Sequence, residues 1–483
     1  MFQVGCAVPL GPGFGHVRRQ VAVRADMAEA AQVHVRIADE LVNAGNRELP
    51  YLDVDSPAGR AVDRGRLTIL VDGRELQVSS LNSEPSAPQR IRFVLPWVPK
   101  QRQTLFLDYD LPAGSSDGGI IGATAEGFYI ADRFAFPVYL PPVGIFVRSD
   151  SQARAQSIEV TAPAEFRVLA SGRERRTIRS GETTVRQFRL SPADFPVYVI
   201  AGRYLEQNVK TSHGSVIFWT FRPLDAPAAQ AAAARLAATA VTFGQVFGPL
   251  AKNSWPVRIV ELPTPTAPSR ATGSEIAAGS FPQGVLLDGR SITQGIASEP
   301  VLERAEYELA GSWFGWRTRP SLESKILLGS GIGLFAVARA AEARGGEAAR
   351  RKQVEQLLAR YDAARQEAAD GALLKLSAGL SREQEATNSY RAALFLLALE
   401  DLAGREGFDR VLRRIWMAMA GKEIAVAELR SAIEAETGRD LGAVFRAWLN
   451  GPGLPGDFRA RYAASPERRA SISETVAGQS EAR

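Results

Sequence analysis

The sequence predicts an α+β protein in which an antiparallel β domain comes first and a mostly helical domain follows. Two observations carry this prediction. Between residues 16 and 206, short alternating and β-branched segments recur with turn residues between them, and beyond residue 299 nearly every segment has helical patterning. The 483 residues exceed one ordinary domain of ~100–200 residues, so at least two domains are expected.

The first of these regions is predicted to form an antiparallel β-sandwich or saddle-shaped domain. Val33, Val35 and Ile37 alternate with their neighbours, which places one set of side chains on a buried face. Turn signals such as Ser171-Gly172 separate the runs. Further strand-like runs cover residues 67–71, 91–95, 105–109, 157–160, 184–190 and 197–200. Short strands at this spacing are typical of a sandwich.

The second region begins with an alanine-rich helix that ends at Phe247. Asp225 is the candidate N-cap of this helix, and Pro227 lies in its first turn. Residues 257–262 and 285–287 have the pattern of short strands. Helices are expected at residues 299–315, 334–368, 382–402, 406–419, 425–437 and 440–449.

These patterns divide the chain into four parts. We expect a flexible N-terminal segment at 1–15, a β domain at 16–206, a second α+β domain at 207–464 and a disordered, polar tail at 465–483. Hydrophobic residues make up 45% of the chain and charged residues 23%, a composition typical of globular proteins with packed cores. Fibrous and wholly disordered classes are therefore excluded.

The chain carries 58 basic and 53 acidic residues, a net charge of +5. This excess is small for the length and forms no dense basic block, so a nucleic-acid partner is not predicted. Cys6 is the single cysteine, which excludes intrachain disulfides and cysteine-rich metal clusters. The three histidines are His16, His34 and His213, so no imidazole follows residue 213.

The N-terminus leaves two alternatives for localisation. Gly5-Cys6 followed by Ala-Val-Pro-Leu-Gly-Pro-Gly resembles the first residues of a mature bacterial lipoprotein, in which the cysteine is lipidated. Cys6 is then either a lipid anchor at the cell envelope, with a signal sequence upstream of this start, or a free thiol in the cytoplasm. No stretch reaches the ~18 apolar residues of a membrane-spanning helix, so none is predicted.

One segment resembles a known zinc site. Residues 307–315, Tyr-Glu-Leu-Ala-Gly-Ser-Trp-Phe-Gly, resemble the zinc-binding helix of the aminopeptidase N and leukotriene-A hydrolase family, the gluzincin zinc metallopeptidases. That family carries His-Glu-Leu-Ala-His-Gln-Trp-Phe-Gly there. Residues 195–204 resemble the last strand of its β domain, 256–263 the first strand of its catalytic domain, and 390–395 the segment with its catalytic tyrosine. The ordered likeness spans residues 30–460.

The resemblance implies a thermolysin-like second domain and a cleft between the two domains that receives an extended peptide. The bound partner would then be a peptide or protein. The sequence indicates no oligomeric state.

The zinc-ligand positions of the family have lost their donors. Tyr307 and Gly311 stand where the resemblance implies the two histidines, and Ser330 stands near the third ligand, 19 positions after Gly311. A glycine has no donor atom, and a tyrosine would have to lose a proton whose ordinary pKa is ~10. We therefore predict that the zinc site is absent and that the protein has no cofactor.

Two further positions keep the residue types of the family. The resemblance gives Glu308 the place of the general base and Tyr390 that of the tyrosine that stabilises the oxyanion. Without a metal, the pKa of water stays near ~15.7 rather than ~7, a handicap of ~12 kcal/mol, whereas a lone carboxylate supplies ~3–5 kcal/mol. Both residues are therefore expected to be vestigial. The alternatives are an ion pair between Glu308 and Arg304 and a buried aromatic role for Tyr390.

The amine-anchoring motif of the family, Gly-x-Met-Glu-Asn, has a loose counterpart at residues 273–277, Gly-Ser-Glu-Ile-Ala. Glu275 is therefore a candidate contact for a peptide N-terminus, and the alternative is a solvated loop carboxylate. Leu302, Ala305, Leu309 and Trp313 share a helical face and are expected to pack in the core.

These expectations favour a non-catalytic aminopeptidase-like protein, a pseudopeptidase, that serves as a peptide- or protein-binding or scaffold module. The alternative is an active aminopeptidase-like hydrolase with an unconventional metal site or a metal-independent mechanism. A third hypothesis is a partner subunit for an active peptidase or a transporter.

Overall fold

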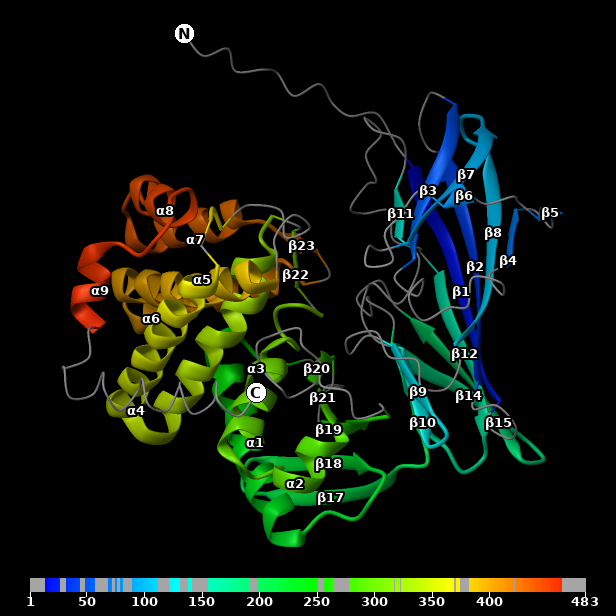
Figure 1. The fold of residues 1–483 in the computed structure, drawn as a ribbon, viewed down its shortest axis with the longest axis horizontal. Coiled ribbons are helices and arrows are strands. Elements are labelled where there is room, and N and C mark those ends of the chain that lie inside the picture. The colour runs from blue at the N-terminus through cyan, green and yellow to red at the C-terminus, as the bar shows by residue number, and fades with distance from the viewer. Residues whose placement is uncertain are drawn as a thin grey trace. The chain divides into compact units, whose positions relative to one another are not determined.

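The chain forms two compact units. The computed structural model describes residues 14–26, 32–43, 48–56, 68–71, 74–75, 79–80, 89–111, 121–130, 138–140, 155–190, 198–250, 256–263, 278–282, 284–316, 318–321, 323–368, 371–373, 382–420 and 422–462. Unit 1 comprises Met1–Tyr204 and Leu262–Ala267, and unit 2 comprises Leu205–Glu261 and Pro268–Arg483 (Figure 1). The polar tail at 465–483 lies outside the described residues.

The largest sheet of unit 1 has eight strands. In spatial order they are β14 (Arg173–Ser180), β15 (Thr183–Leu190), β12 (Ala155–Pro163), β1 (Phe14–Asp26), β2 (Gln32–Asn43), β8 (Arg102–Leu111), β4 (Thr68–Val71) and β5 (Arg74–Glu75). Residues 14 and 15, expected in a flexible segment, instead begin β1. All neighbours pair antiparallel except β1 and β12, which pair in parallel.

Two four-stranded antiparallel sheets complete unit 1. The first contains β13 (Arg167–Ala170), β16 (Val199–Gly202), β10 (Gly127–Ile130) and β9 (Ile121–Thr124), and the second contains β11 (Val138–Leu140), β3 (Leu49–Ser56), β7 (Gln89–Trp97) and β6 (Ser79–Ser80). The alternation predicted in β2 is confirmed, because Val33, Val35 and Ile37 are fully buried in the core of this unit. The β domain expected from the sequence is therefore present.

Unit 2 begins with a mixed sheet. Its strands in spatial order are β17 (Leu205–Thr211), β18 (Gly214–Thr220), β19 (Val257–Leu262), β21 (Gly284–Asp288) and β20 (Ala278–Phe281). The pairs β17–β18 and β20–β21 are antiparallel, and β18–β19 is parallel. A short parallel pair joins β22 (Arg319–Pro320) to β23 (Glu423–Ile424).

The rest of unit 2 is helical. Its helices are α1 (Ala226–Phe247), α2 (Gly289–Gly295), α3 (Glu299–Ala310), a π-helix η6 (Ile326–Gly331), α4 (Ile332–Glu367), α5 (Arg382–Ala403), α6 (Arg405–Ala418), α7 (Val426–Thr437), α8 (Gly442–Leu449) and α9 (Gly456–Tyr462). The cap of α1 is confirmed, because the Asp225 carboxylate accepts a hydrogen bond of 3.0 Å from the backbone nitrogen of Ala228. Figure 1 shows α4 to α9 gathered on one side of this sheet, whereas α2 overlaps its strands in the view.

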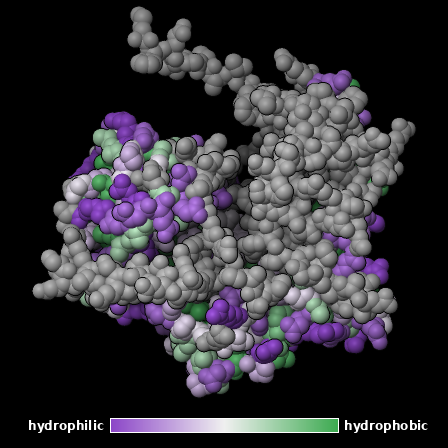
Figure 2. All heavy atoms as spheres, in the orientation of Figure 1, coloured by the Kyte–Doolittle hydropathy of each residue, from purple (hydrophilic) through white to green (hydrophobic). Residues whose placement is uncertain are grey.

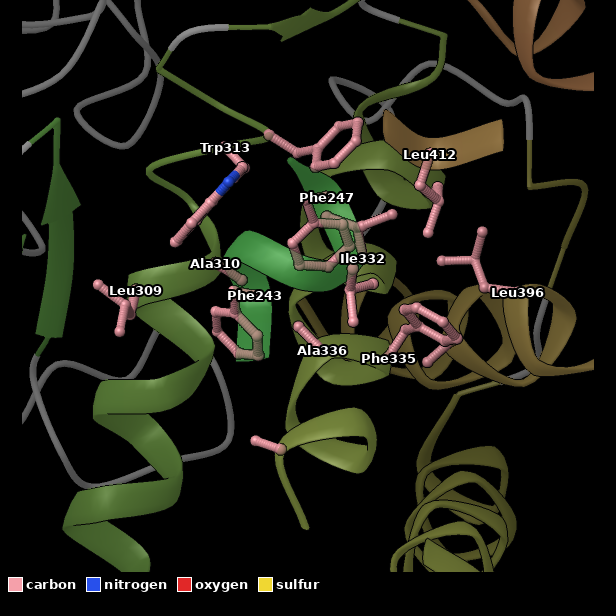
Figure 3. Packing of buried hydrophobic residues seen from close by; sticks show 14 of the residues in the cluster. Phe243, Phe247, Leu309, Ala310, Trp313, Ile332, Phe335, Ala336, Leu396 and Leu412 are labelled. Carbon is pink, nitrogen blue, oxygen red and sulfur yellow. The ribbon is translucent and has the colours of Figure 1, made fainter. Parts of the chain in front are cut away.

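The core of unit 2 is built from aromatic and aliphatic side chains of α1, α3–α6 and the segment after α3 (Figure 3). The ring of Trp313 lies edge-on to that of Phe243, with centroids 5.7 Å apart. The Trp313 indole also donates a 2.7 Å hydrogen bond to the carbonyl oxygen of Gly248. The face predicted to pack, which includes Leu309 and Trp313, is fully buried, so this expectation is confirmed.

Among the described residues, one helical stretch, Ile326–Glu367, is long and apolar enough to be considered for a membrane span, with a mean hydropathy of 1.5. Of its apolar window, 78% is buried inside the protein. A buried core helix passes the same test, and the contacts of η6 and α4 with α5 account for this apolar character.

A buried network of charges joins α4, α5 and α6. Arg339 on α4 contacts Glu400 on α5 and makes a 2.9 Å ion pair with Asp409 on α6. Arg350 makes a second ion pair of 2.5 Å with Glu400. Burial raises the pKa of Asp409 to about 6, although Arg339 acts in the opposite direction. The other carboxylate oxygen of Asp409 is buried and has no hydrogen-bond partner among the described residues.

The raised pKa of Asp409 predicts how the stability of the folded protein changes with pH. In the unfolded chain this carboxyl ionises near pH 3.8, but in the folded protein it ionises near 6. The folded protein therefore loses up to about 3 kcal/mol of stability as the pH rises through this interval. As the pH rises from about 4 to about 6, we expect the difference in unfolding free energy between Asp409→Asn and the wild type to shift in favour of the variant. Urea unfolding measures this difference.

The control is Glu406→Gln on the same helix, because the Glu406 side chain is 94% exposed. A stability difference between Asp409→Asn and the wild type that stays constant over this pH interval would contradict the prediction.

Candidate functional site

The last turn of α3 and the residues after it carry the candidate site. Residues 304, 307, 308 and 311 recur at helical spacing and share one face of the helix. The helix expected over 299–315 ends early, at Ala310. After that residue, the backbone nitrogens of residues 311 to 313 donate to the carbonyls three residues earlier rather than four. The backbone nitrogen of Gly311 donates to the carbonyl of Glu308 at 2.9 Å, and that of Ser312 donates to Leu309 at 3.0 Å.

The structure brings Tyr307 and Ser330 into contact. A hydrogen bond joins the two side chains, although 22 residues separate them in the sequence. The Tyr307 ring lies against Gly333 on α4, since a Cβ atom at Gly333 would come within 2.6 Å of the ring. Burial raises the pKa of the Tyr307 hydroxyl, and the nearby Glu308 carboxylate raises it further, so this group stays protonated at neutral pH.

Position 311 has no room for a side chain. A Cβ atom there would lie 2.6 Å from the Ser280 hydroxyl oxygen and 3.0 Å from the Ser280 Cβ. That hydroxyl accepts a 3.0 Å hydrogen bond from the indole of Trp316, which holds it in place. The strand β20 thus fills the space into which a ligand from residue 311 would have to project.

Glu308 is paired with Arg304, as its spacing predicts. One guanidinium nitrogen of Arg304 lies 2.5 Å from a carboxylate oxygen of Glu308. The same guanidinium lies over the Tyr307 ring, 4.9 Å from its centroid. Glu308 is only 8% exposed; burial raises its pKa, and Arg304 partly opposes this shift. The Glu308 carboxylate, for which the resemblance implies the general-base position, is therefore engaged by an internal cation.

Tyr390 lies on α5, half-buried, and packs against the core of unit 2. The turn that holds Ser330 lies close to the same helix, because a Cβ atom at Gly331 would come within 2.7 Å of the Ala392 Cβ. Among the residues that the structure describes, no hydrogen bond joins Tyr390 to Glu308. Glu308 and Tyr390 thus both lie in unit 2, without a hydrogen bond between them in the described part of the chain.

These residues do not fit a zinc ion of the gluzincin type. Such a site needs three nitrogen or oxygen donors that converge on the metal. Here Tyr307 and Ser330 bond to each other, and Gly311 offers no donor and no space. Among the described residues, no group of three or more histidine, cysteine, aspartate or glutamate side chains is arranged to hold a metal ion.

The remaining candidates lie elsewhere. Glu275 and Cys6 are outside the described residues. His34 belongs to unit 1, where its ring nitrogens lie 2.8 Å from carboxylate oxygens of Asp108 and Asp110. His213 lies in the exposed turn between β17 and β18.

Sequence reasoning missed two residues of this site. Ser280 closes position 311 from a strand 31 residues earlier, and Gly333 accommodates the Tyr307 ring. Neither stands at a spacing from the motif helix that would reveal the contact. The sequence shows a glycine at position 333, but it does not show that the Tyr307 ring packs against it.

The fold of this chain, a three-sheet β unit followed by a unit with a mixed sheet and a helical bundle, is similar to the two-domain fold of solved M1 zinc metallopeptidases. The M1 zinc metallopeptidase from Deinococcus radiodurans superposes with a TM-score of 0.59 at 16% identity, over 92% of this chain and 96% of that one. A point mutant of that enzyme bound to the substrate Tyr-Ser-Ala gives 0.59 and 16%, over 92% and 95%.

A two-domain M1 zinc metallopeptidase mutant bound to L-arginine gives a TM-score of 0.60 at 16% identity, over 92% of this chain and 96% of that one. At this identity the likeness shows the fold alone. No protein-family model matches the sequence, and no curated protein matches it.

Proposed function

We propose that this protein is a non-catalytic relative of the M1 aminopeptidases that binds a peptide or protein, or serves as a scaffold, without zinc at the family's position. The observation that carries the proposal is the contact set of the three ligand positions. Tyr307 is hydrogen-bonded to Ser330, and Gly311 lies against Ser280. Side chains that satisfy one another in this way have a packing role and leave no converging donors.

The state of Glu308 supports the same proposal. A general base must reach a water molecule at hydrogen-bond distance with a free acceptor oxygen. Arg304 holds one oxygen of this carboxylate at 2.5 Å in a largely buried pair, which stabilises the carboxylate and lowers its tendency to take a proton from water. Without a Lewis acid, the deficit of ~12 kcal/mol in water activation exceeds the ~3–5 kcal/mol that a positioned carboxylate supplies.

Zinc analysis and a hydrolysis assay test the proposal together. We expect purified protein to contain well under one equivalent of zinc by elemental analysis and to give no saturable heat on titration with zinc. We also expect aminoacyl-anilide hydrolysis at the background rate, with the same rate for Glu308→Gln, because that residue activates no water in this proposal.

The alternative hypothesis, an active hydrolase with an unconventional metal site or none, makes the opposite prediction. It requires hydrolysis above background that Glu308→Gln abolishes. Stoichiometric, tightly bound zinc would likewise overturn the proposal. The retention of Glu308 and Tyr390 at the family's positions is the observation that keeps this alternative worth the assay.

A further inference from the structure

The strand β14 forms one edge of the eight-stranded sheet. It pairs with β15 on one side, and among the described strands it has no neighbour on the other. Seven of its eight residues are exposed, and Ile178 is half-buried. An edge strand of this kind offers a row of backbone N–H and C=O groups to a further strand.

The same strand is rich in arginine. The hairpin from Arg173 to Leu190 contains six arginines against two glutamates, and four of these arginines lie in β14 itself, at positions 173, 175, 176 and 179. The single acid of β14, Glu174, contacts Thr177 and lies 3.6 Å from Arg186 of β15. The four arginines of β14 therefore have no carboxylate partner among the described residues. Figure 2 shows hydrophilic side chains in the region where this hairpin lies in Figure 1.

The pairing register places these arginines on both faces of the sheet edge. Arg173 lies opposite the exposed Arg189, and Arg176 lies opposite Gln187. Arg179 lies opposite Thr184, whose side chain is buried, and so faces the other way. A membrane surface or a nucleic-acid duplex can contact only one of these faces. A strand added beside β14 presents its own side chains to both faces in alternation.

We propose that the β14 edge binds an extended acidic peptide segment of a partner protein by strand addition. Backbone hydrogen bonds to the open edge provide the alignment, and carboxylates of the added strand pair with the arginines on either face. From Arg173 to Arg179 the strand covers about 20 Å, enough for about six peptide residues. This surface belongs to unit 1 and does not depend on the function proposed for unit 2.

Fluorescence anisotropy with a labelled synthetic peptide, Thr-Glu-Glu-Val-Thr-Glu-Glu-Val, whose glutamates lie on both faces of an extended strand, tests the proposal at low ionic strength. The test variant combines Arg176→Glu with Arg179→Glu. The matched control combines Arg222→Glu with Arg439→Glu, two exposed arginines outside β14, so the change in net charge is identical. A second peptide has the same sequence with alternate backbone nitrogens methylated, which keeps the charge but removes one edge of hydrogen-bond donors.

We expect the test variant to bind the peptide roughly tenfold more weakly or worse, and the control variant to bind like the wild type. The methylated peptide should lose binding, and the bound peptide should slow amide hydrogen exchange in β14. Equal binding by both variants or of both peptides would overturn the proposal. Tighter binding to single-stranded DNA or to phosphatidylglycerol vesicles than to the peptide would also overturn it. If the wild type does not bind the peptide, the proposal is also overturned, and the arginines instead protect an exposed edge strand from unwanted pairing.

Discussion

Replacing Tyr307, Gly311 and Ser330 together with His, His and Glu is expected to yield a protein that binds zinc more weakly than about 1 µM. The reason is position 311, where even a Cβ atom comes within 2.6 Å of the Ser280 hydroxyl. A histidine there must displace β20 or turn away from the other two ligands. Two donors without the third do not complete the site.

Two matched variants separate this cause from a general loss of folding. The double variant Tyr307→His with Ser330→Glu is expected to bind zinc as weakly as the triple variant, because residue 311 contributes no ligand to either. Addition of Ser280→Gly to the triple variant removes the two Ser280 atoms nearest the Cβ, one of them the closest of all at 2.6 Å, and leaves the carbonyl oxygen of Glu308 at 2.9 Å. We expect it to improve zinc affinity by roughly tenfold or more, as measured by competition with a chelating dye. A triple variant that binds one zinc ion with nanomolar affinity would contradict this account.

Loss of Arg391 is expected to destabilise unit 2 by about 3–5 kcal/mol. Arg391 on α5 is completely buried. Its guanidinium donates a 2.8 Å hydrogen bond to the carbonyl of Gly371 and further hydrogen bonds to the carbonyls of Trp448 and Gly451. Trp448 lies in the last turn of α8, where helix carbonyls lack intrahelical donors, and Gly451 follows the end of that helix. Arg391→Met keeps much of the side-chain volume but leaves these carbonyls without this donor.

Urea unfolding of Arg391→Met measures this loss directly. The control is Arg459→Met on α9, whose side chain is 41% exposed and pairs at 2.6 Å with Asp362, which is 47% exposed. An exposed pair of this kind contributes at most about 1 kcal/mol. A loss below about 1 kcal/mol for Arg391→Met would show that the buried contacts do not stabilise the protein as inferred here.

Features of the fold with a short-range cause could be predicted from the sequence. Asp225 caps α1 because an aspartate three residues before Ala228 accepts a hydrogen bond from its backbone nitrogen. Val33, Val35 and Ile37 are two residues apart along β2, so their side chains lie on the same, buried face of the strand. The strand predicted at residues 257–262 coincides with β19, where an apolar run is bounded by prolines.

Other elements depend on contacts between distant segments. The parallel pairing of β1 with β12 joins residues more than 130 positions apart, and no local pattern encodes it. The π-helix η6 lies where Gly331 approaches Ala392 of α5. The early end of α3 could not be read from the sequence, because apolar residues at helical spacing continue through Trp313.

At the candidate site, the sequence by itself determined the residue types at three positions. The resemblance implies zinc ligands at residues 307, 311 and 330, where this chain has tyrosine, glycine and serine, and no histidine follows residue 213. It also determined the pairing of Glu308 with Arg304, because residues four positions apart on a helix lie side by side whatever surrounds them.

Only the tertiary structure decided how the altered positions are occupied. Ser280 occupies the space beside Gly311, and Gly333 leaves room for the Tyr307 ring. The arginine-rich strand at the edge of the large sheet is β14. These contacts depend on how whole elements pack against one another. Such packing is set by the combined burial of many side chains rather than by the spacing of a few residues.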